Sequence, residues 1–169
     1  MTTDPKPKRN RILAIDPGTE QSAFVLWDET DTEFGPLIDK GIWPNAELPP
    51  LIASNYHDHL AIEMIASYGM PVGKTTFETC LWIGMFLFPS IADDACIIQA
   101  DFRNLLIYRK DVKMCLCGST KAKDSNIRQA LIDRYGEPGT KKEPGILYGV
   151  KKDIWAALAV ATYYQDMRL

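Results

Sequence analysis

Two short apolar runs of the chain each carry one carboxylate where a charge is costly. Residues 12–16, ILAID, end on Asp16 before a Pro-Gly-Thr turn, and residues 60–65, LAIEMI, contain Glu63. Continuous apolar runs of this length are typical of strands that are buried on both faces. A buried carboxylate is retained when a cation, a hydrogen-bond partner or a metal compensates its charge. For Asp16 alone, a carboxylate that merely caps the following turn is an equally good interpretation.

A third acid, Asp153, lies in the first turn of the last predicted helix, which begins near Lys151. Carboxylates gathered on a small patch repel one another unless divalent cations bridge them, and Mg²⁺ accepts oxygen ligands while it retains waters. Two such ions about 3.5–4 Å apart can activate a water and stabilise the leaving oxygen of a phosphodiester. If the fold brings the three acids together, the chemistry they suit is metal-dependent phosphodiester hydrolysis.

The hydrophobic pattern predicts the elements that must position these acids. Residues 22–28 are expected to return from the first strand as a hairpin, and residues 33–43 contain a third strand that Gly35 and Pro36 interrupt. Beyond them we predict a helix at 47–60, a strand at 60–65, a loop at 68–73, a helix capped by Thr75 or Thr76, a strand at 95–99, helical segments at 102–109, 112–117 and 125–135, a loop at 137–149 and the last helix. This order favours an α/β, ribonuclease-H-like fold, in which a mixed five-stranded sheet is flanked by helices on both faces. In that fold the three acids converge.

The composition is that of one globular domain, with 169 residues of which 46% are apolar and 24% charged. We expect a basic tail at residues 1–10 and a single domain at residues 11–169. No apolar run approaches the length of a membrane span and no signal-peptide core follows the tail, so we expect a cytoplasmic protein without a membrane partner. The four cysteines form no Cys-x-x-Cys pair, which favours reduced and mainly buried thiols.

The net charge of −3 conceals an asymmetry along the chain. Residues 103–152 carry twelve Lys and Arg against five Asp and Glu, a local excess of seven positive charges. A basic face beside an acidic site is a layout that suits a nuclease, and the alternative is a surface whose charges are scattered all round the fold. A second metal candidate is His57-Asp58-His59, but alternating residues near a helix end more often form plain surface, which is the interpretation we favour.

Four motifs in chain order resemble the RuvC family of Holliday-junction resolvases, specifically the RuvC-like crossover junction endodeoxyribonucleases of tailed phages. They are ILAIDPGT, LAIEMIASYGMPVGK, YRKDVKMCLCGSTKAKDSNIRQALIDRYG and GVKKDIWAALAVA, and together they span about residues 11 to 165. The resemblance implies a homodimeric endonuclease that resolves four-way junctions and other branched DNA by paired nicks, leaving 5′-phosphate and 3′-hydroxyl ends. It implies two Mg²⁺ ions in each active site, with Mn²⁺ as a substitute and no small-molecule cofactor. For a phage-encoded enzyme, the expected location is the cytoplasm of the host cell.

Residue by residue, the resemblance assigns Asp16, Glu63 and Asp153 as the catalytic and metal-binding acids. Lys113 matches a family lysine that approaches DNA, while a second family lysine falls on Asp124, so that Lys123 or Lys121 is expected to replace it. The family places an aromatic wedge where this chain has Ala66, and Tyr68 is the expected substitute. The DNA-binding candidates are Lys113, Lys121, Lys123, Tyr68, Lys110, Arg128 and Lys152.

One departure from the family concerns the last helix, where Ala156 stands in place of a fourth acid. Either Asp153 serves both ions, or one ion is held mainly by DNA and water. The departure also leaves open a catalytically weakened module of the same fold that binds branched DNA without cleaving it. A further alternative is a fragment of an actin-like ATPase, because Asp-x-Gly-Thr is also the first phosphate loop of that class, although such proteins need two domains of this kind.

Overall fold

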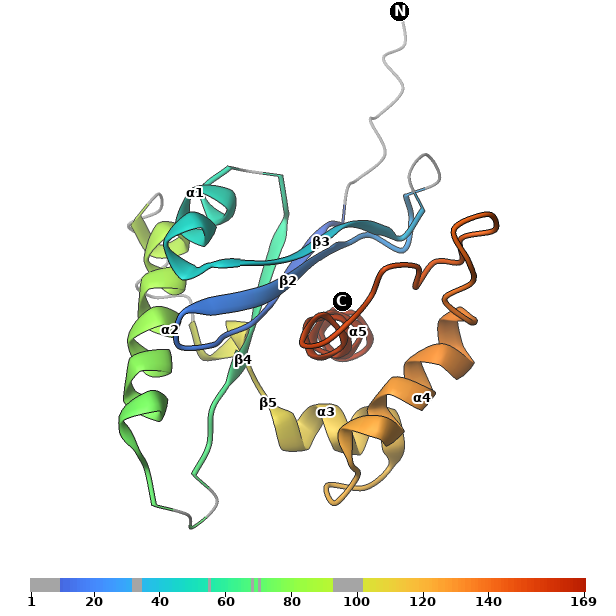
Figure 1. Ribbon diagram of the computed structural model, residues 1–169. Coiled ribbons are helices and arrows are strands. Elements are labelled where there is room, and N and C mark those ends of the chain that lie inside the picture. The colour runs from blue at the N-terminus through green and yellow to red at the C-terminus, as the bar shows by residue number, and fades with distance from the viewer. Residues whose placement is uncertain (1–9, 32–34, 55, 68, 70, 93–101) are drawn as a thin grey trace, which may run out of the picture.

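A computed structural model of the chain describes residues 10–31, 35–54, 56–67, 69, 71–92 and 102–169, with the side chains of residues 89–92 and 102 excepted. This part of the chain contains a mixed five-stranded sheet in the order β3-β2-β1-β4-β5 (Figure 1). Its strands are β1 (Ile12–Asp16), β2 (Gln21–Trp27), β3 (Leu37–Pro44), β4 (His59–Met64) and β5 (Leu106–Tyr108). The first three strands are antiparallel neighbours, whereas β4 runs parallel to both β1 and β5.

Helices cover both faces of the sheet, as the sequence predicted. The helical elements are η1 (Asn45–Glu47), α1 (Leu48–Ile52), α2 (Lys74–Ala92), η2 (Phe102–Leu105), α3 (Arg109–Cys117), α4 (Asp124–Tyr135) and α5 (Ile154–Arg168). One face carries α1 and α2, while the other carries α5 with α3 and α4 packed beside it (Figure 1). No helix among the described residues is both long enough and apolar enough to cross a bilayer.

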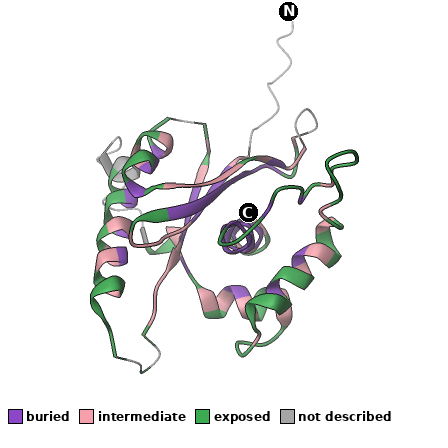
Figure 2. Cartoon of the chain, viewed as in Figure 1, coloured by how far each residue is buried: buried purple, intermediate pink, exposed green. Residues whose placement is uncertain are grey.

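Strand β1 shows how the chain divides its side chains between two cores. Ile12 and Ala14 are buried in the core that α5 covers, whereas Leu13 and Ile15 are buried in the core under α1 and α2. The central strands and α5 are accordingly coloured as buried in Figure 2. Successive side chains of a strand point to opposite faces. Asp16 therefore falls on the α5 face, at the end of the strand.

Helix α5 is buried on every side along its first half. Each residue from Ile154 to Ala161 is buried, so this helix shows no polar stripe. Its small alanines let the backbone lie close to the sheet, and each fully buried aliphatic side chain adds about 1.5–3 kcal/mol to stability. Trp155 and the residues after it are thus packed inside the fold. The packing also fixes where α5 begins, directly after Asp153.

Two predicted helices were wrong because long-range strand pairing overrides local spacing. The helix predicted at 47–60 ends at Ile52, since the Ser54 hydroxyl bonds the Leu51 carbonyl and the chain then turns to pair with the carbonyl of Arg11. The segment 102–109 keeps only one helical turn, in η2. Leu106–Tyr108 form β5, which pairs with β4, and Arg109 begins α3.

Smaller differences concern element ends and cysteines. Thr75 and Thr76 lie inside α2, which begins at Lys74, so neither caps it. The predicted end of the helical segment 112–117 is confirmed, and Gly118 directly after it has a left-handed φ of 66° that glycine tolerates without strain. Cys80, Cys115 and Cys117 are free thiols as expected, but Cys115 is exposed and the other two are only half-buried. The basic tail up to residue 9, the strand predicted at 95–99, Cys96 and Tyr68 lie outside the described residues.

Candidate active site

The first two candidate acids lie side by side at the ends of neighbouring parallel strands. Ile15 of β1 pairs with Ile62 of β4, so Asp16 and Glu63 are the next residues along each strand. Glu63 shares the face of Ala61, which packs in the α5 core, as Asp16 shares the face of Ala14. Both carboxylates therefore project to the side of the sheet on which α5 begins.

The electrostatics of Asp16 place the third acid, Asp153, in the same cluster. Burial raises the pKa of Asp16 to about 8, and the negative charges of Glu63 and Asp153 contribute further to the rise. Burial likewise raises the pKa of Glu63, against the opposing charge of Arg109. Asp153 itself is exposed, as the residue that precedes α5. The structure thus brings together the three acids that the sequence singled out.

Arg109 joins this cluster, although its sequence context did not single it out. Its Nη1 donates to Oε2 of Glu63 at 3.0 Å and its Nη2 donates to Oδ1 of Asp124 at 2.8 Å. Arg109 is the first residue of α3, where the helix dipole disfavours a cation, so its two acidic partners compensate an otherwise unfavourable position. The missed signal was the run Leu-Leu-Ile-Tyr before it, a third short apolar run that ends next to a charged residue.

Asp124 was also missed as a member of this cluster. It is the first residue of α4, where an acid is favoured by the helix dipole, and its side chain is 78% exposed. Its charge reaches the other acids, because it contributes to the raised pKa values of both Asp16 and Glu63. The sequence showed only that Asp124 occupies a place where the resembling family has a lysine.

A closed set of hydrogen bonds holds the turn that follows Asp16. The amide of Gly18 donates to Oγ of Ser22 at 3.1 Å, the Ser22 hydroxyl donates to Oδ1 of Asn45 at 2.6 Å, and Nδ2 of Asn45 donates to the Gly18 carbonyl at 3.0 Å. Ser22 and Asn45 are both buried. A Cβ on Gly18 would lie 2.3 Å from the Gln21 carbonyl oxygen, so this close turn requires glycine. Ser22, and not Asp16, is the side chain that caps the turn, which leaves the carboxylate of Asp16 available.

Two of the predicted DNA-binding residues lie beside the acids. Lys113 is one helical turn beyond Arg109, and its charge acts to lower the pKa of Glu63. Lys152 directly precedes Asp153 and has a left-handed φ of 48°, a conformation that costs free energy for a residue with a side chain. The surrounding fold therefore fixes an unfavourable backbone conformation at the start of α5.

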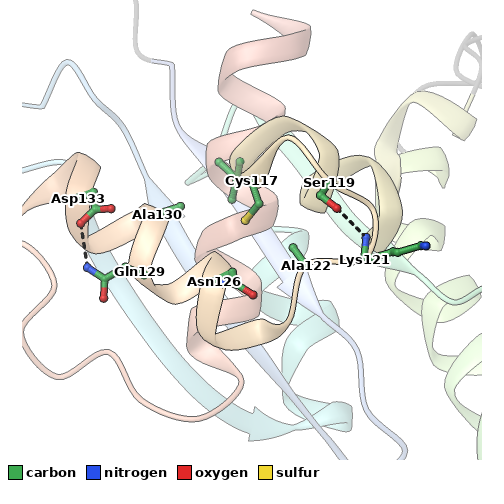
Figure 3. A pocket seen from close by; sticks show the side chains of 9 residues that line it. Cys117, Ser119, Lys121, Ala122, Asn126, Gln129, Ala130 and Asp133 are labelled. Atoms are coloured by element: carbon green, nitrogen blue, oxygen red, sulfur yellow. Dashed lines mark hydrogen bonds between the residues drawn. The ribbon is translucent and has the colours of Figure 1, made fainter.

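The other basic candidates lie around α3 and α4. Lys110 lies 5.9 Å from the centre of the Tyr108 ring, and the guanidinium of Arg128 lies 4.8 Å from the Trp155 ring. The exposed Lys123 precedes α4. Lys121 borders a pocket of about 410 Å³ between α3 and α4, and its side chain extends away from the other labelled residues (Figure 3). None of these four contacts the acids in the hydrogen bonds and ion pairs of the described residues.

The segment His57-Asp58-His59 has a structural role in the described part of the chain. The Asp58 carboxylate accepts a hydrogen bond from the Arg11 amide at 3.0 Å. Nε2 of His59 lies 3.0 Å from Oδ1 of Asn10. These contacts fasten the start of β4 to the start of β1. Asp58 is exposed as the surface interpretation expected, whereas His57 and His59 are half-buried and the segment leads into a strand and not out of a helix.

Solved structures with the same arrangement of elements include RuvC from Thermus thermophilus. Its TM-score is 0.60 at 14% sequence identity, and the match covers 93% of this chain and 96% of that chain. The chain has the RuvC fold. T. thermophilus RuvC in complex with a Holliday junction substrate matches with a TM-score of 0.57 at 13% identity, over 92% of this chain and 93% of that one. No family model matches the chain, and neither does any curated protein.

Within this RuvC fold, the donor set fits a hard divalent cation. Asp16 and Glu63 offer carboxylate oxygens, the ligands that Mg²⁺ prefers, and burial disfavours their ionised forms until a cation lies close. In the described residues no three acidic, histidine or cysteine side chains are arranged to hold one ion. Glu63 instead directs Oε2 to Arg109. Ala156, one turn beyond Asp153, adds no oxygen ligand.

Proposed function

We propose that this protein is a metal-dependent, structure-selective DNA endonuclease that resolves Holliday junctions and other branched DNA by paired nicks. The nicks leave 5′-phosphate and 3′-hydroxyl ends, and the enzyme is of the RuvC-like crossover junction type found in tailed phages. The observation that carries the proposal is the pair of half-buried carboxylates, Asp16 and Glu63, at the ends of adjacent strands with Asp153 beside them. The RuvC fold and the four sequence motifs support it.

In this proposal Asp16, Glu63 and Asp153 hold Mg²⁺, or Mn²⁺ in its place. The bound metal would activate water and neutralise charge on the phosphodiester. Asp16 is presented by a strand end that the Gly18 turn keeps rigid, so its carboxylate needs little reordering when a cation binds. Lys113, one turn along α3, would contact a backbone phosphate near the reacting bond, and the action of its charge on Glu63 supports this role.

Branched DNA would be held by the basic residues of α3, α4 and the start of α5. The residues proposed for this surface are Lys110, Lys113, Lys121, Lys123, Arg128 and Lys152. The guanidinium of Arg128 stacks on a ring, which leaves its N–H groups free to bind phosphates. Binding through phosphates depends on shape more than on sequence and weakens as salt rises. The proposal that Tyr68 acts as the junction wedge rests on the sequence alone.

Paired nicks require two active sites, and we propose that α2 forms the homodimer interface. Phe77, Leu81, Met85 and Phe88 are large, exposed apolar side chains at helical spacing, so they form one stripe along α2. This α2 stripe is exposed, whereas Ile83 and Phe86 of the same helix are buried in the core between α2 and the sheet. Exposed apolar patches of this kind mark association surfaces. A pocket of about 590 Å³ between α2 and the turn after β1 is lined by Leu81 and Met85 of the α2 stripe and by Thr19 and Glu20 of that turn.

The test is cleavage of a labelled four-way junction by wild-type protein and by Asp16→Asn, in Mg²⁺, in Mn²⁺ and in chelator, beside a linear duplex. We expect paired nicks in opposing strands with either ion, and none with chelator or with Asp16→Asn. Equal cleavage of linear duplex, or nicks that persist in chelator, would contradict the proposal.

A second candidate function is a module that binds junctions without cleaving them, and Ala156 motivates it. The helix position one turn beyond Asp153 carries a methyl group instead of a carboxylate, so metal ligation has one acid fewer. Salt-dependent binding of the junction, with no nicks in Mg²⁺ or Mn²⁺, would favour this candidate over the first.

A further inference from the structure

The guanidinium of Arg109 lies inside the acidic cluster and not at its rim. It contacts Glu63 and Asp124 directly, and its charge acts to lower the pKa of Asp16. The side chain is 23% exposed, so one part of it is sheltered by the fold and another part faces the solvent. A guanidinium has five N–H donors in a fixed plane, and the contacts with Glu63 and Asp124 use Nη1 and Nη2.

The two partners of Arg109 differ in how firmly they hold it. Glu63 is on a central strand of the sheet and its side chain is 14% exposed, so this ion pair is sheltered and fixed. Asp124 is 78% exposed at the start of a helix, and ion pairs with such exposed carboxylates add little stability. The Nη1 side of Arg109 is thus anchored, while the Nη2 side can exchange Asp124 for another anion.

The charges of the site indicate which anion would replace Asp124 beside Nη2 of Arg109. The site has three carboxylates, from Asp16, Glu63 and Asp153. Ala156 has no carboxylate at the position of the fourth acid. Fewer carboxylates attract fewer divalent ions, because ligand charge must offset the mutual repulsion of two such ions. A permanently charged guanidinium already lies beside Glu63, and its planar edge matches the two non-bridging oxygens of a phosphodiester.

We propose that Arg109 is a catalytic residue that binds the scissile phosphate through its Nη2 edge, displacing Asp124, and that its fixed charge takes the place of a second metal ion. The inference rests on the proposed nuclease function. In the step it serves, a water oxygen bonds to phosphorus and the bond from phosphorus to the 3′-oxygen breaks. The 3′-oxygen gains a proton and the attacking water loses one, while Arg109 donates hydrogen bonds and keeps all its protons.

A competing arrangement uses the same residues. Asp124 could turn from Arg109 and bind a second ion, which would make it the fourth acid that Ala156 does not provide. The two arrangements differ in the number of ions in each protomer and in the effect of removing the Asp124 charge. Both differences can be measured on the whole protein.

The first measurement is the number of Mn²⁺ ions bound per protomer, by isothermal titration of the free protein and of its complex with an uncleavable phosphorothioate junction. We expect one ion in wild-type protein and one ion in Asp124→Asn. Two ions in wild-type protein, or the loss of an ion in Asp124→Asn, would overturn the inference. This measurement decides the inference even if wild-type protein makes no nicks, the outcome by which the proposed function itself would fail.

The second measurement separates the cleavage rate from junction binding. At saturating junction, Arg109→Gln is expected to lower the single-turnover rate by about 10²–10³-fold, the usual cost of removing one charge-stabilising donor. Its junction Kd in chelator should change by less than about threefold, because one phosphate contact among many contributes little to affinity. A wild-type rate in Arg109→Gln, or a rate loss in Asp124→Asn of the same size, would overturn the inference.

Two further variants test whether misfolding causes the rate loss of Arg109→Gln. Arg109→Lys keeps a positive charge for Glu63 but lacks the planar edge, so it should fold with an unchanged melting temperature and still lose at least about tenfold in rate. A rate in Arg109→Lys equal to that of wild type would mean that Arg109 serves only as a structural charge. Lys141→Gln removes one exposed positive charge in the loop before α5 and should leave the rate unchanged.

Discussion

The two faces of the sheet carry helices of opposite character. Helix α5 is buried on all sides through its first half, and the acids Asp16, Glu63 and Asp153 lie where it begins. Helix α2 is buried along one side only, and the α2 stripe faces outward. The α5 face holds charges in fixed positions, which catalysis requires. The α2 face leaves exposed apolar area, which under the proposed function serves the second molecule that paired cleavage requires. On that proposal, the comparison separates chemistry from assembly.

The largest expected effect is the loss of cleavage rate when one of the acids on the α5 face is replaced. Glu63→Gln should lower the junction cleavage rate by about 10³-fold or more, because it removes a charged metal ligand worth several kcal/mol of transition-state stabilisation. The same substitution on the other face, Glu78→Gln, removes an exposed helical ion pair with Lys74. Its junction cleavage rate should stay within about threefold of wild type. Single-turnover cleavage of a labelled junction measures both, and similar losses would contradict the division between the faces.

A matched pair of leucines tests the packing side of the comparison. Leu158→Ala on α5 should lower the free energy of unfolding by about 2–5 kcal/mol, since Leu158 is fully buried between helix and sheet. Leu81→Ala on α2 should change the stability of the monomer by about 0.5 kcal/mol or less, because Leu81 is 71% exposed. Urea unfolding at low protein concentration reports both values. Comparable losses would mean that α2 is covered within the monomer.

The assembly side of the comparison is tested by placing a charge on the α2 stripe. Leu81→Glu should weaken self-association by at least about tenfold, because burying an unpaired carboxylate in an apolar interface is costly. Sedimentation equilibrium of wild type and variant measures the shift. Binding of a junction should persist in the variant, while the two nicks become uncoupled. A monomeric wild-type protein, or a variant that dimerises normally, would place the interface elsewhere.

The most gradual expected effect concerns the pH dependence of stability. Burial, with the charge of Glu63, raises the pKa of Asp16 to about 8 from its ordinary 3.8, so the folded state binds this proton more tightly than the unfolded state does. Stability from this group is therefore fully present below about pH 4 and is lost as the pH rises toward 8. Asp16→Asn cannot ionise, and in chelator its stability advantage over wild type should grow with pH, by at most about 1.4 kcal/mol per pH unit.

Thermal melts at pH 5, 6.5 and 8 in chelator test this dependence. Added Mg²⁺ should reduce the advantage of Asp16→Asn, because the cation offsets the charge that the variant lacks. The control Asp39→Asn, at an exposed position of β3, should show no advantage that grows with pH. An Asp16→Asn difference that is constant over this range would mean that Asp16 is already ionised in the folded protein.

Local sequence patterns determined much of this fold. The apolar runs at β1 and β4 and the buried alanine-rich start of α5 predicted where each of the three acids would lie along its element. Gly118 predicted the end of α3. These features depend on residues within a few positions of one another, so periodicity and turn chemistry are sufficient to find them.

Tertiary structure alone decided the remaining features. Arg109 is 46 residues from Glu63 and 15 from Asp124, and its place between them depends on β5, a strand whose residues have helical spacing in the sequence. The exposure of the α2 stripe depends equally on which side of α2 meets the sheet, because its apolar residues run all round the helix. The sequence alone determined which side chains can do chemistry. Long-range pairing of strands decided which of them meet, since the free energy of such pairing comes from partners that local sequence does not specify.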